Sequence, residues 1–226
     1  MQRTISAMVG KGSVNHNSRK FRAENVDGTR THLNIDYCNE NIKTVYHELF
    51  DEALERYNAK QTRSDRKIKD YYEKIRSSKQ EKPFHEIILQ VGGKGNMNAD
   101  TENGELAKKI LDEYYQGFQE RNPQLRVFSA HLHMDEATPH LHIDFIPFTT
   151  GSKRGLDTRV SLKQALATQG FKGGSRGDTE WSQWVQSEKE QLAAVMERYG
   201  IEWEHKGTHE KHLSVLDYKK QEREKE

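Results

Sequence analysis

Histidines that could bind a metal ion are concentrated within residues 131–142. Four of the eleven histidines in the chain lie there, arranged as two His-Leu-His triplets. Because side chains alternate between the two faces of a β-strand, His140 and His142 should point the same way. His131 and His133 should do the same on the strand before. Each triplet therefore predicts half of a metal site.

The residues between the triplets indicate how these halves meet. They are polar and end in Pro139, which disfavours helix in the residue before it and is typical of the connection of an antiparallel hairpin. Such a hairpin brings His133, His140 and His142 within reach of one divalent ion and leaves coordination positions open, as catalytic metal sites do. His131 lies a further ~6.8 Å along its strand, which favours a supporting role over ligation.

Carboxylates accompany these histidines. In the connection, Glu136 could act as a base or orient another side chain, while Asp135 is better placed to fix the turn. The sequence alone does not separate these two roles. Glu86 lies in an apolar strand expected at residues 84–91, where an unpaired carboxylate would be costly, so we expect a partner for it beside the site.

Three motifs, in the same order, resemble those of the plasmid mobilisation relaxases of the Mob/Pre group, which belong to the His-hydrophobic-His endonucleases. They are His133-x-Asp-Glu-x-Thr-Pro-His140-x-His142, His16-Asn17-x-Arg19 and His32-Leu33-Asn34. The likeness runs from the first expected strand to about residue 203. It implies the relaxase fold, and a function in which one DNA strand is nicked at an origin of transfer, held covalently and religated.

The resemblance also implies roles for particular residues. His16 occupies the position where this group carries a histidine nucleophile, and the first tyrosine of the chain is Tyr37, beyond the whole opening segment. Arg19 would brace the phosphate, and His32 would support the site. Three imidazoles with open positions, acting on a phosphodiester, favour manganese or magnesium.

The net charge of +1 hides an uneven distribution. Residues 1–32 sum to +4 and residues 151–176 to +5, whereas the remainder is acidic. Two basic segments predict a surface that meets DNA phosphates in two places. The residues that we expect to contact DNA, as a single strand or a hairpin, are Lys11, Asn17, Lys20, Arg22, Lys153, Arg154, Arg159, Lys172 and Arg176.

Two other functions fit part of this pattern. A metal-dependent phosphodiester hydrolase that uses bound water would need the same three histidines, but it would leave His16 dispensable. A non-catalytic DNA-binding module would bind without cleaving. The His-Asn-x-Arg motif in a basic segment favours the relaxase, because a plain hydrolase has no need of it.

The surrounding pattern predicts an α+β domain, with a central antiparallel sheet and helices packed on its faces. Strands are expected at residues 2–9, 31–37, 84–91, 125–133 and 140–148. Helices are expected from Ile42 to Tyr57, from a cap at Ser64 to Ile75, at 101–121, at 161–169, and from a cap at Asp178 or Thr179 to Tyr199, whose inward face includes Tyr199. Residues 13–30 and 149–155 are expected to be loops.

Composition bounds the remaining expectations. Hydrophobic residues make up only 33% of the chain, and no apolar run approaches the length of a membrane span or a signal peptide. One cysteine, Cys38, fits a reducing cytoplasm. We expect a catalytic domain at 1–203 and, at 204–226, the start of a charged helical extension. A longer C-terminal region of this kind could serve dimerisation.

Overall fold

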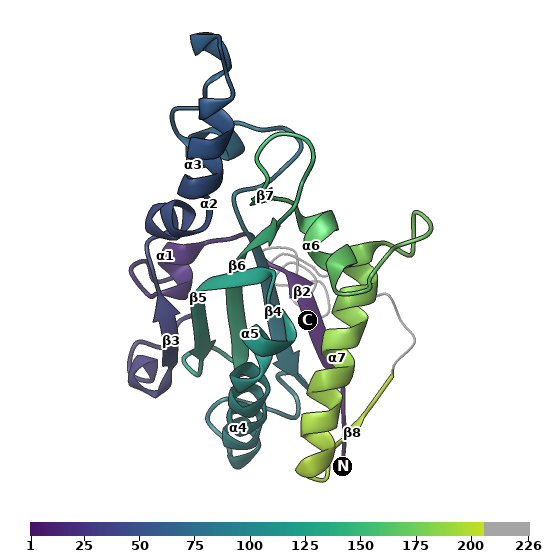
Figure 1. The fold of residues 1–226 in the computed structure, drawn as a ribbon. Helices are drawn as coiled ribbons and strands as arrows, with labels where there is room; N and C mark the ends of the chain where they lie inside the picture. Colours follow the sequence, from purple (N-terminus) through teal and green to yellow (C-terminus); the bar gives the residue numbers. More distant parts are fainter. Residues whose placement is uncertain (206–226) are drawn as a thin grey trace, which may run out of the picture.

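The computed structural model describes residues 1–205, which form an α+β domain around one antiparallel sheet (Figure 1). The strands run in the order β2 (Ile5–Val9), β4 (His85–Val91), β6 (His140–Thr149), β5 (Leu125–His133) and β3 (Ile35–Asn39). Three short strands complete the pairing: β7 (Arg159–Val160) joins β6, and β1 (Gln2–Arg3) runs parallel to β8 (Glu202–Trp203). The expected fold class is confirmed.

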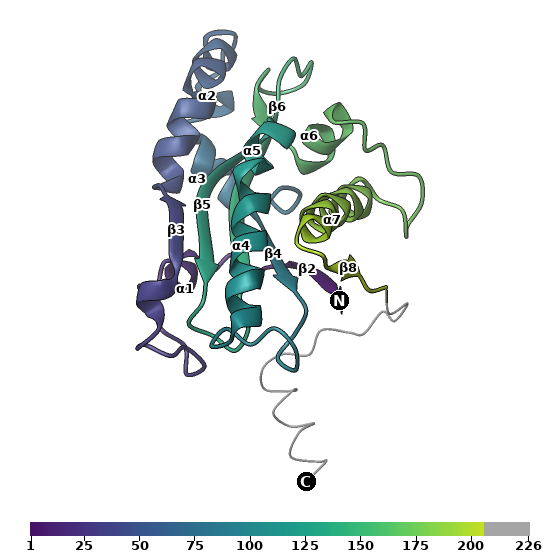
Figure 2. The same cartoon turned by 90° about the horizontal axis from the view of Figure 1, so that it is seen from below.

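Helices cover both faces of the sheet (Figures 1 and 2). On one face, α4 (Glu102–Gln116), α5 (Phe118–Arg121), α6 (Leu162–Thr168) and α7 (Glu180–Arg198) enclose the larger hydrophobic core. On the other face, α2 (Ile42–Ala59) and α3 (Tyr71–Arg76) enclose a smaller one. No helix in residues 1–205 is long and apolar enough to cross a membrane.

A β-bulge divides the face that carries α2 and α3 into an apolar end and a polar end. The pairing of β5 with β6 shifts register between Val127 and Ser129, so Phe128 and Ser129 both escape the larger core. Phe128 packs with Phe50 and Ile146 in the smaller core. Ser129 instead begins a polar row that runs toward the histidines, so the bulge marks where packing gives way to the candidate site.

The structure corrects several sequence-based expectations. Residues 31–33 form a 3-10 turn, η1 (Thr31–Leu33), and not the start of a strand, so His32, Asn34 and Asp36 do not share a strand face. Residues 64–66 form a second 3-10 turn, η2 (Ser64–Arg66), and α3 begins after Asp70, whose side chain caps it. Tyr199 is exposed and does not face inward.

Two further differences concern continuity. The helix expected at residues 101–121 is divided at Gly117 into α4 and α5. The segment 13–30 contains a single helical turn, α1 (Val14–Asn17), which carries His16. The expected helical extension at 204–226 falls almost wholly outside the described residues, so that boundary stays a prediction.

The two long helices of the larger core are joined by a buried carboxylate. Glu188 of α7, 3% exposed, accepts hydrogen bonds from the Tyr114 hydroxyl at 2.5 Å, from Arg121 Nη2 at 3.1 Å and from Asn122 Nδ2 at 2.9 Å. The side-chain oxygen of Asn122, Oδ1, in turn accepts from the Trp184 indole at 2.7 Å. Every partner comes from another element or another turn, so this network fixes how α4, α5 and α7 meet.

Glu188→Ala should destabilise the domain strongly, because it leaves a buried amide, a buried hydroxyl and a half-buried arginine without this acceptor. We expect the free energy of unfolding, measured by urea titration, to fall by about 2–4 kcal/mol. Glu190→Ala, on the exposed side of the same helix, is the matched control and should change it by less than about 0.5 kcal/mol. Equal effects would show that the network does not hold the helices together.

Candidate metal centre and nucleophile

The register of β5 against β6 creates the candidate metal site. His133 pairs with His140 and His131 with His142, so all four histidines project from adjacent positions on the polar end of the sheet. Potential ligand atoms of His133, His140 and His142 all lie within 4.8 Å of one another. His131 does not belong to this group. The expected trio is therefore brought together by a hairpin of the expected kind.

Hydrogen bonds on the outer nitrogens orient these three rings. His133 Nε2 lies 2.8 Å from the Asn17 carbonyl oxygen, His140 Nδ1 lies 2.8 Å from the Thr138 carbonyl oxygen, and His142 Nδ1 lies 2.6 Å from Glu86 Oε1. Since all three partners can only accept, each outer nitrogen carries the proton and the lone pair is left on the inner nitrogen.

The inner nitrogens fit a cation. His133 Nδ1 and His140 Nε2 are 3.4 Å apart, and the buried His142 Nε2 has no hydrogen-bond partner among residues 1–205. When His140 is neutral, its Nε2 lone pair faces that of His133 Nδ1, and these two atoms and the orphaned His142 nitrogen are unfavourable unless something positive lies between them. Burial and the neighbouring imidazoles lower the pKa of His133 far below its ordinary value, and burial lowers that of His142 to about 4. These two rings are therefore neutral, as metal ligation requires. Burial would also lower the pKa of His140, but the Glu136 contact raises it above the ordinary value, so His140 gives up a proton when it binds an ion.

Glu86 has the partner that its burial demands, and it lies directly behind the metal trio. Besides His142, it accepts from the Asn17 side-chain amide at 2.8 Å and from the Gly12 backbone amide at 2.7 Å. Burial alone would raise the pKa of Glu86, but the His142 contact and these two donors hold it below the ordinary value. The carboxylate therefore stays ionised and strengthens His142 as a ligand.

Asn17 lies behind the site and not on its surface. The sequence assigns Asn17 to the DNA contacts, whereas the structure leaves it 1% exposed. Its amide also donates to Asp144 Oδ2 at 3.0 Å, and its carbonyl oxygen holds His133. Burial, together with the nearby Glu86 charge, raises the pKa of Asp144 to about 7. Asn17 thus links α1 to three buried polar residues of the sheet.

Asp135 and Glu136, which the sequence could not separate, occupy different places. Asp135 is fully buried and accepts hydrogen bonds from Arg19, from the Thr31 hydroxyl at 3.0 Å and from the Asn34 amide at 2.8 Å. It ties the hairpin turn to two earlier segments of the chain. Burial opposes its ionisation, but these donors keep its pKa below the ordinary value. Asp135 therefore fixes the turn.

Glu136 faces the reactive groups instead. Its Oε1 lies 3.4 Å from His16 Nε2, 3.5 Å from His140 Nε2 and 2.9 Å from Arg19 Nη2. Burial would raise its pKa, yet the contacts with His140, His16 and Arg19 lower it far below the ordinary range. An ionised carboxylate thus lies between the metal trio and His16, where it can orient His16, whereas its low pKa makes it a weak base.

Arg19 connects His16 to this centre through a strained backbone. It has φ 56°, a left-handed conformation that no other non-glycine residue adopts within residues 1–205. Its guanidinium is bound to Asp135 and Glu136, and Nη1 lies 3.2 Å from His16 Nε2. Because the carboxylates occupy most of its donors, Arg19 is built to hold His16 in place more than to brace a phosphate alone.

Two histidines of the motifs stand apart from the metal trio. His131 is 1% exposed; its Nδ1 lies 2.6 Å from Asp36 Oδ1, and its Nε2 has no hydrogen-bond partner in the described part of the chain. His32 is exposed and its Nδ1 lies 2.9 Å from the Thr29 carbonyl oxygen. The supporting roles expected for both remain predictions. Of the two, His131 lies closer to the metal trio, because its ring centroid is 6.3 Å from that of His133.

The basic residues expected to contact DNA are mostly exposed but do not form one patch. Arg159 is half-buried and donates to Ser152 Oγ. Loop 170–178, with Lys172 and Arg176, lies beyond α6 and α7, on the other side of the sheet from α1 (Figures 1 and 2). The remaining exposed members are Lys11, Lys20, Arg22, Lys153 and Arg154.

A third basic region was missed in the sequence. Residues 56–82, here called the basic arm, comprise the end of α2, η2, α3 and the following loop, and carry ten Lys/Arg against four Asp/Glu. The arm packs on the same sheet face as the histidines, and Arg56 binds Asp157 at 2.8 Å beside the 149–158 loop. A window of net charge along the chain would have found it.

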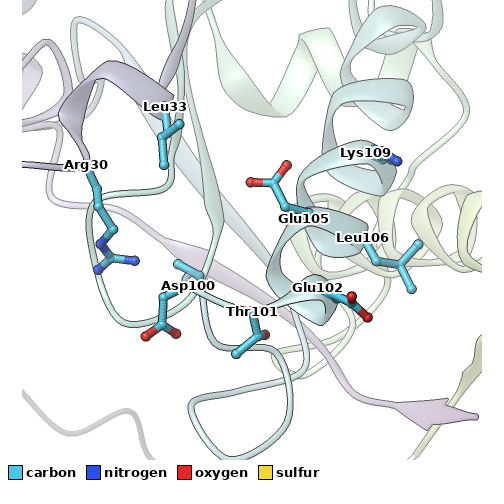
Figure 3. Close-up of a pocket in the computed structure, with 9 residues that line it drawn as sticks. Arg30, Leu33, Asp100, Thr101, Glu102, Glu105, Leu106 and Lys109 are labelled. Atoms are coloured by element: carbon cyan, nitrogen blue, oxygen red, sulfur yellow. The ribbon is translucent and has the colours of Figure 1, made fainter.

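A separate cavity of about 430 Å³ lies behind the hairpin turn (Figure 3). It is lined by η1 and the first turns of α4, including Arg30, Leu33, Asp100, Glu102 and Glu105. None of the metal-binding residues lines it. Arg30 Nη2 also donates to the Glu136 carbonyl oxygen at 3.1 Å, so this wall of the cavity supports the turn.

Comparison with solved structures identifies the class of fold. Crystal structures of the MobM relaxase domain, Mn-bound and in complex with a 22-nucleotide pMV158 oriT DNA, superpose with TM-scores of 0.55 and 0.56 at 21% and 20% identity. Each match covers 96% of this chain and 99% of that domain. The fold is that of a relaxase domain.

Comparison of sequences identifies the family. The model of the plasmid recombination enzyme family matches residues 13–220, and the chain belongs to this Mob/Pre family. A type 2 plasmid recombination enzyme of Staphylococcus aureus (strain Mu50) is 26% identical over 100% of this chain and 46% of its own length. A plasmid recombination enzyme from a Bacillus species is 25% identical over 96% of this chain and 44% of its own length. The chain spans less than half the length of these curated relatives.

His142→Ala should abolish binding of one Mn²⁺ ion per chain, measured by isothermal titration calorimetry, because it removes one of three ligands. His131→Gln is the matched control, since His131 shares the strand face but lies outside the trio, and its variant should keep a stoichiometry of one. Unchanged binding by His142→Ala, or complete loss with His131→Gln, would contradict this choice of ligands.

Proposed function

We propose that this domain nicks one strand of DNA at the origin of transfer of a plasmid or mobile element, and that His16 is the nucleophile. The intermediate would be covalent, and reversal of the step would religate the strand. The observation that carries the proposal is the position of His16 Nε2 beside Glu136 Oε1 and Arg19, next to three histidines oriented for one cation. A hydrolase using water would have no use for that arrangement.

The chemistry requires a nucleophile and neutralised phosphate charge. A divalent ion, Mn²⁺ or Mg²⁺, held by His133, His140 and His142 would stabilise the anionic phosphate oxygens. His16 Nε2 would then form a bond to phosphorus as the bond to the departing oxygen breaks, and that oxygen would take up a proton from solvent water. Before the attack, Glu136 and Arg19 hold the imidazole through Nε2, which lowers the cost of orienting it, and both contacts are given up as Nε2 bonds to phosphorus.

The distribution of charge favours DNA as the partner and one face as its binding surface. The basic arm and the loop carrying Lys153 and Arg154 share the sheet face of the metal trio. Helices α4 and α7 on the opposite face each carry a net charge of −2. Phosphates would be attracted to the face that carries the site and repelled from the other. A DNA substrate and an unpaired Cys38 fit activity in the cytoplasm.

The MobM relaxase domain structures, which contain oriT DNA and manganese, support the same substrate and ion for this chain. The relatives' name supports an activity on plasmids. The curated relatives are more than twice as long as this chain. Dimerisation through a further C-terminal region would be additional to the activity proposed for this domain.

His16→Ala should form no covalent adduct with labelled single-stranded origin DNA, while it keeps Mn²⁺ and DNA binding. The wild-type adduct should be labile to acid, because protonation makes imidazole a good leaving group from phosphorus. Denaturing electrophoresis before and after acidification, followed by mass spectrometry, measures both. An acid-stable adduct, or one that maps to Tyr37 or Tyr46, would return the mechanism to a tyrosine nucleophile.

Neutralising the basic arm should weaken DNA binding in a salt-dependent way. With Arg66, Lys67 and Lys69 all changed to Gln, the slope of log affinity against log salt should fall by roughly 0.9 for each phosphate of duplex DNA that is no longer neutralised, or 0.7 on a single strand. Lys108 and Lys109 of α4, changed to Gln, are the control on the opposite face. An equal change of slope in both variants would mean that the arm is not a DNA surface.

A further inference from the structure

Phe21 is the one phenylalanine that the structure leaves in solvent. It is 61% exposed, whereas the other seven phenylalanines, all within residues 1–205, are buried or half-buried. A single exposed apolar side chain is common in proteins and needs no explanation by itself. Three further features of Phe21, its position, its rigidity and its neighbours, point to a ligand.

The position follows from the reversal of the chain after α1. Because Arg19 adopts a left-handed conformation, the backbone turns back on itself, and the Phe21 amide donates to the Asn15 carbonyl oxygen at 2.9 Å. Phe21 is thereby attached to the residue immediately before His16. Phe21 therefore lies beside the turn that carries the proposed nucleophile.

Hydrogen bonds of the neighbouring Arg19 and Asn17 make that position rigid. Arg19 is held by Asp135 and Glu136, and Asn17 is held by Glu86 and Asp144. The segment between α1 and Phe21 is thus fastened to the sheet at two points. A ring presented on a fixed backbone loses little conformational freedom when it is covered, which suits a recognition contact.

The neighbours supply the complementary charge. Lys20 and Arg22 flank Phe21, and both are exposed. Proteins that bind single-stranded nucleic acid combine basic groups that follow the backbone with aromatic rings on which bases stack. A duplex buries the faces of its bases, so an exposed ring at this position selects an unpaired nucleotide.

We propose that Phe21 stacks on an unpaired nucleobase close to the phosphate attacked by His16, with Lys20 and Arg22 on the adjoining phosphates. This inference rests on the proposed function and adds to it a contact that positions the strand. Stacking is tolerant of base identity because every base has a π-face, so Phe21 would hold the strand in place without reading its sequence.

The test is binding of fluorescently labelled oligothymidylate at low salt in EDTA, so that no strand is cleaved. Phe21→Ala and Phe21→Leu should bind about 5- to 150-fold more weakly than wild type, and Phe21→Trp should bind as well or better. Tyr199→Ala, which removes an exposed aromatic ring at the end of α7, should have no effect. Thermal melting should be unchanged in every Phe21 variant, because the ring contributes nothing to the core.

A second strand separates stacking from charge. On an oligonucleotide of the same length made only of abasic sugar phosphates, wild type and Phe21→Ala should bind equally. Equal binding of oligothymidylate by both proteins, or an undiminished difference on the abasic strand, would overturn the proposal. Failure of His16→Ala to stop nicking would overturn the proposed nucleophile alone, and a wild-type chain that binds no single strand would overturn both.

Discussion

The buried ion pair between Arg19 and Asp135 is the interaction on which the site depends. Asp135 is fully buried in the turn between β5 and β6, and Arg19 belongs to a segment more than a hundred residues earlier. Breaking such a pair costs about 3–5 kcal/mol, because the remaining charge is left without a partner. This pair fastens the segment that carries His16 to the hairpin that carries the metal trio.

The backbone of Arg19 and the other donors around Asp135 support this ion pair. A left-handed arginine is unfavourable, and the strain persists because the carboxylates on the hairpin turn select that conformation. Thr31 and Asn34 complete the shell around Asp135, and the Asn34 side chain also accepts from the Met134 amide at 2.6 Å. Within the motif His32-Leu33-Asn34, the asparagine contacts Asp135, whereas His32 Nδ1 lies against the Thr29 carbonyl oxygen.

The sequence was informative where a local pattern carries the geometry. Alternation in two His-Leu-His triplets predicted a hairpin and its metal trio, because strand periodicity and one turn suffice to specify both. It failed where long-range contacts decide. Asn17 looked like a surface residue of a basic loop, yet Glu86 and Asp144 bury it. No local pattern could show that His32 lies on a 3-10 turn or that Arg19 would direct its donors to two carboxylates.

The polar end of the sheet face shows why so much burial of polar groups is tolerated. Glu86, Asp144, His133 and His142 are each at most 5% exposed, and such groups are costly unless each has a partner. Nearly all have one, but His142 Nε2 and Asp144 Oδ1 do not. The His142 nitrogen is directed at the place where a cation would complete the network. Folding thus satisfies nearly all polar groups of the centre. The nitrogen that is left without a partner would be stabilised by a bound ion, which favours ion binding.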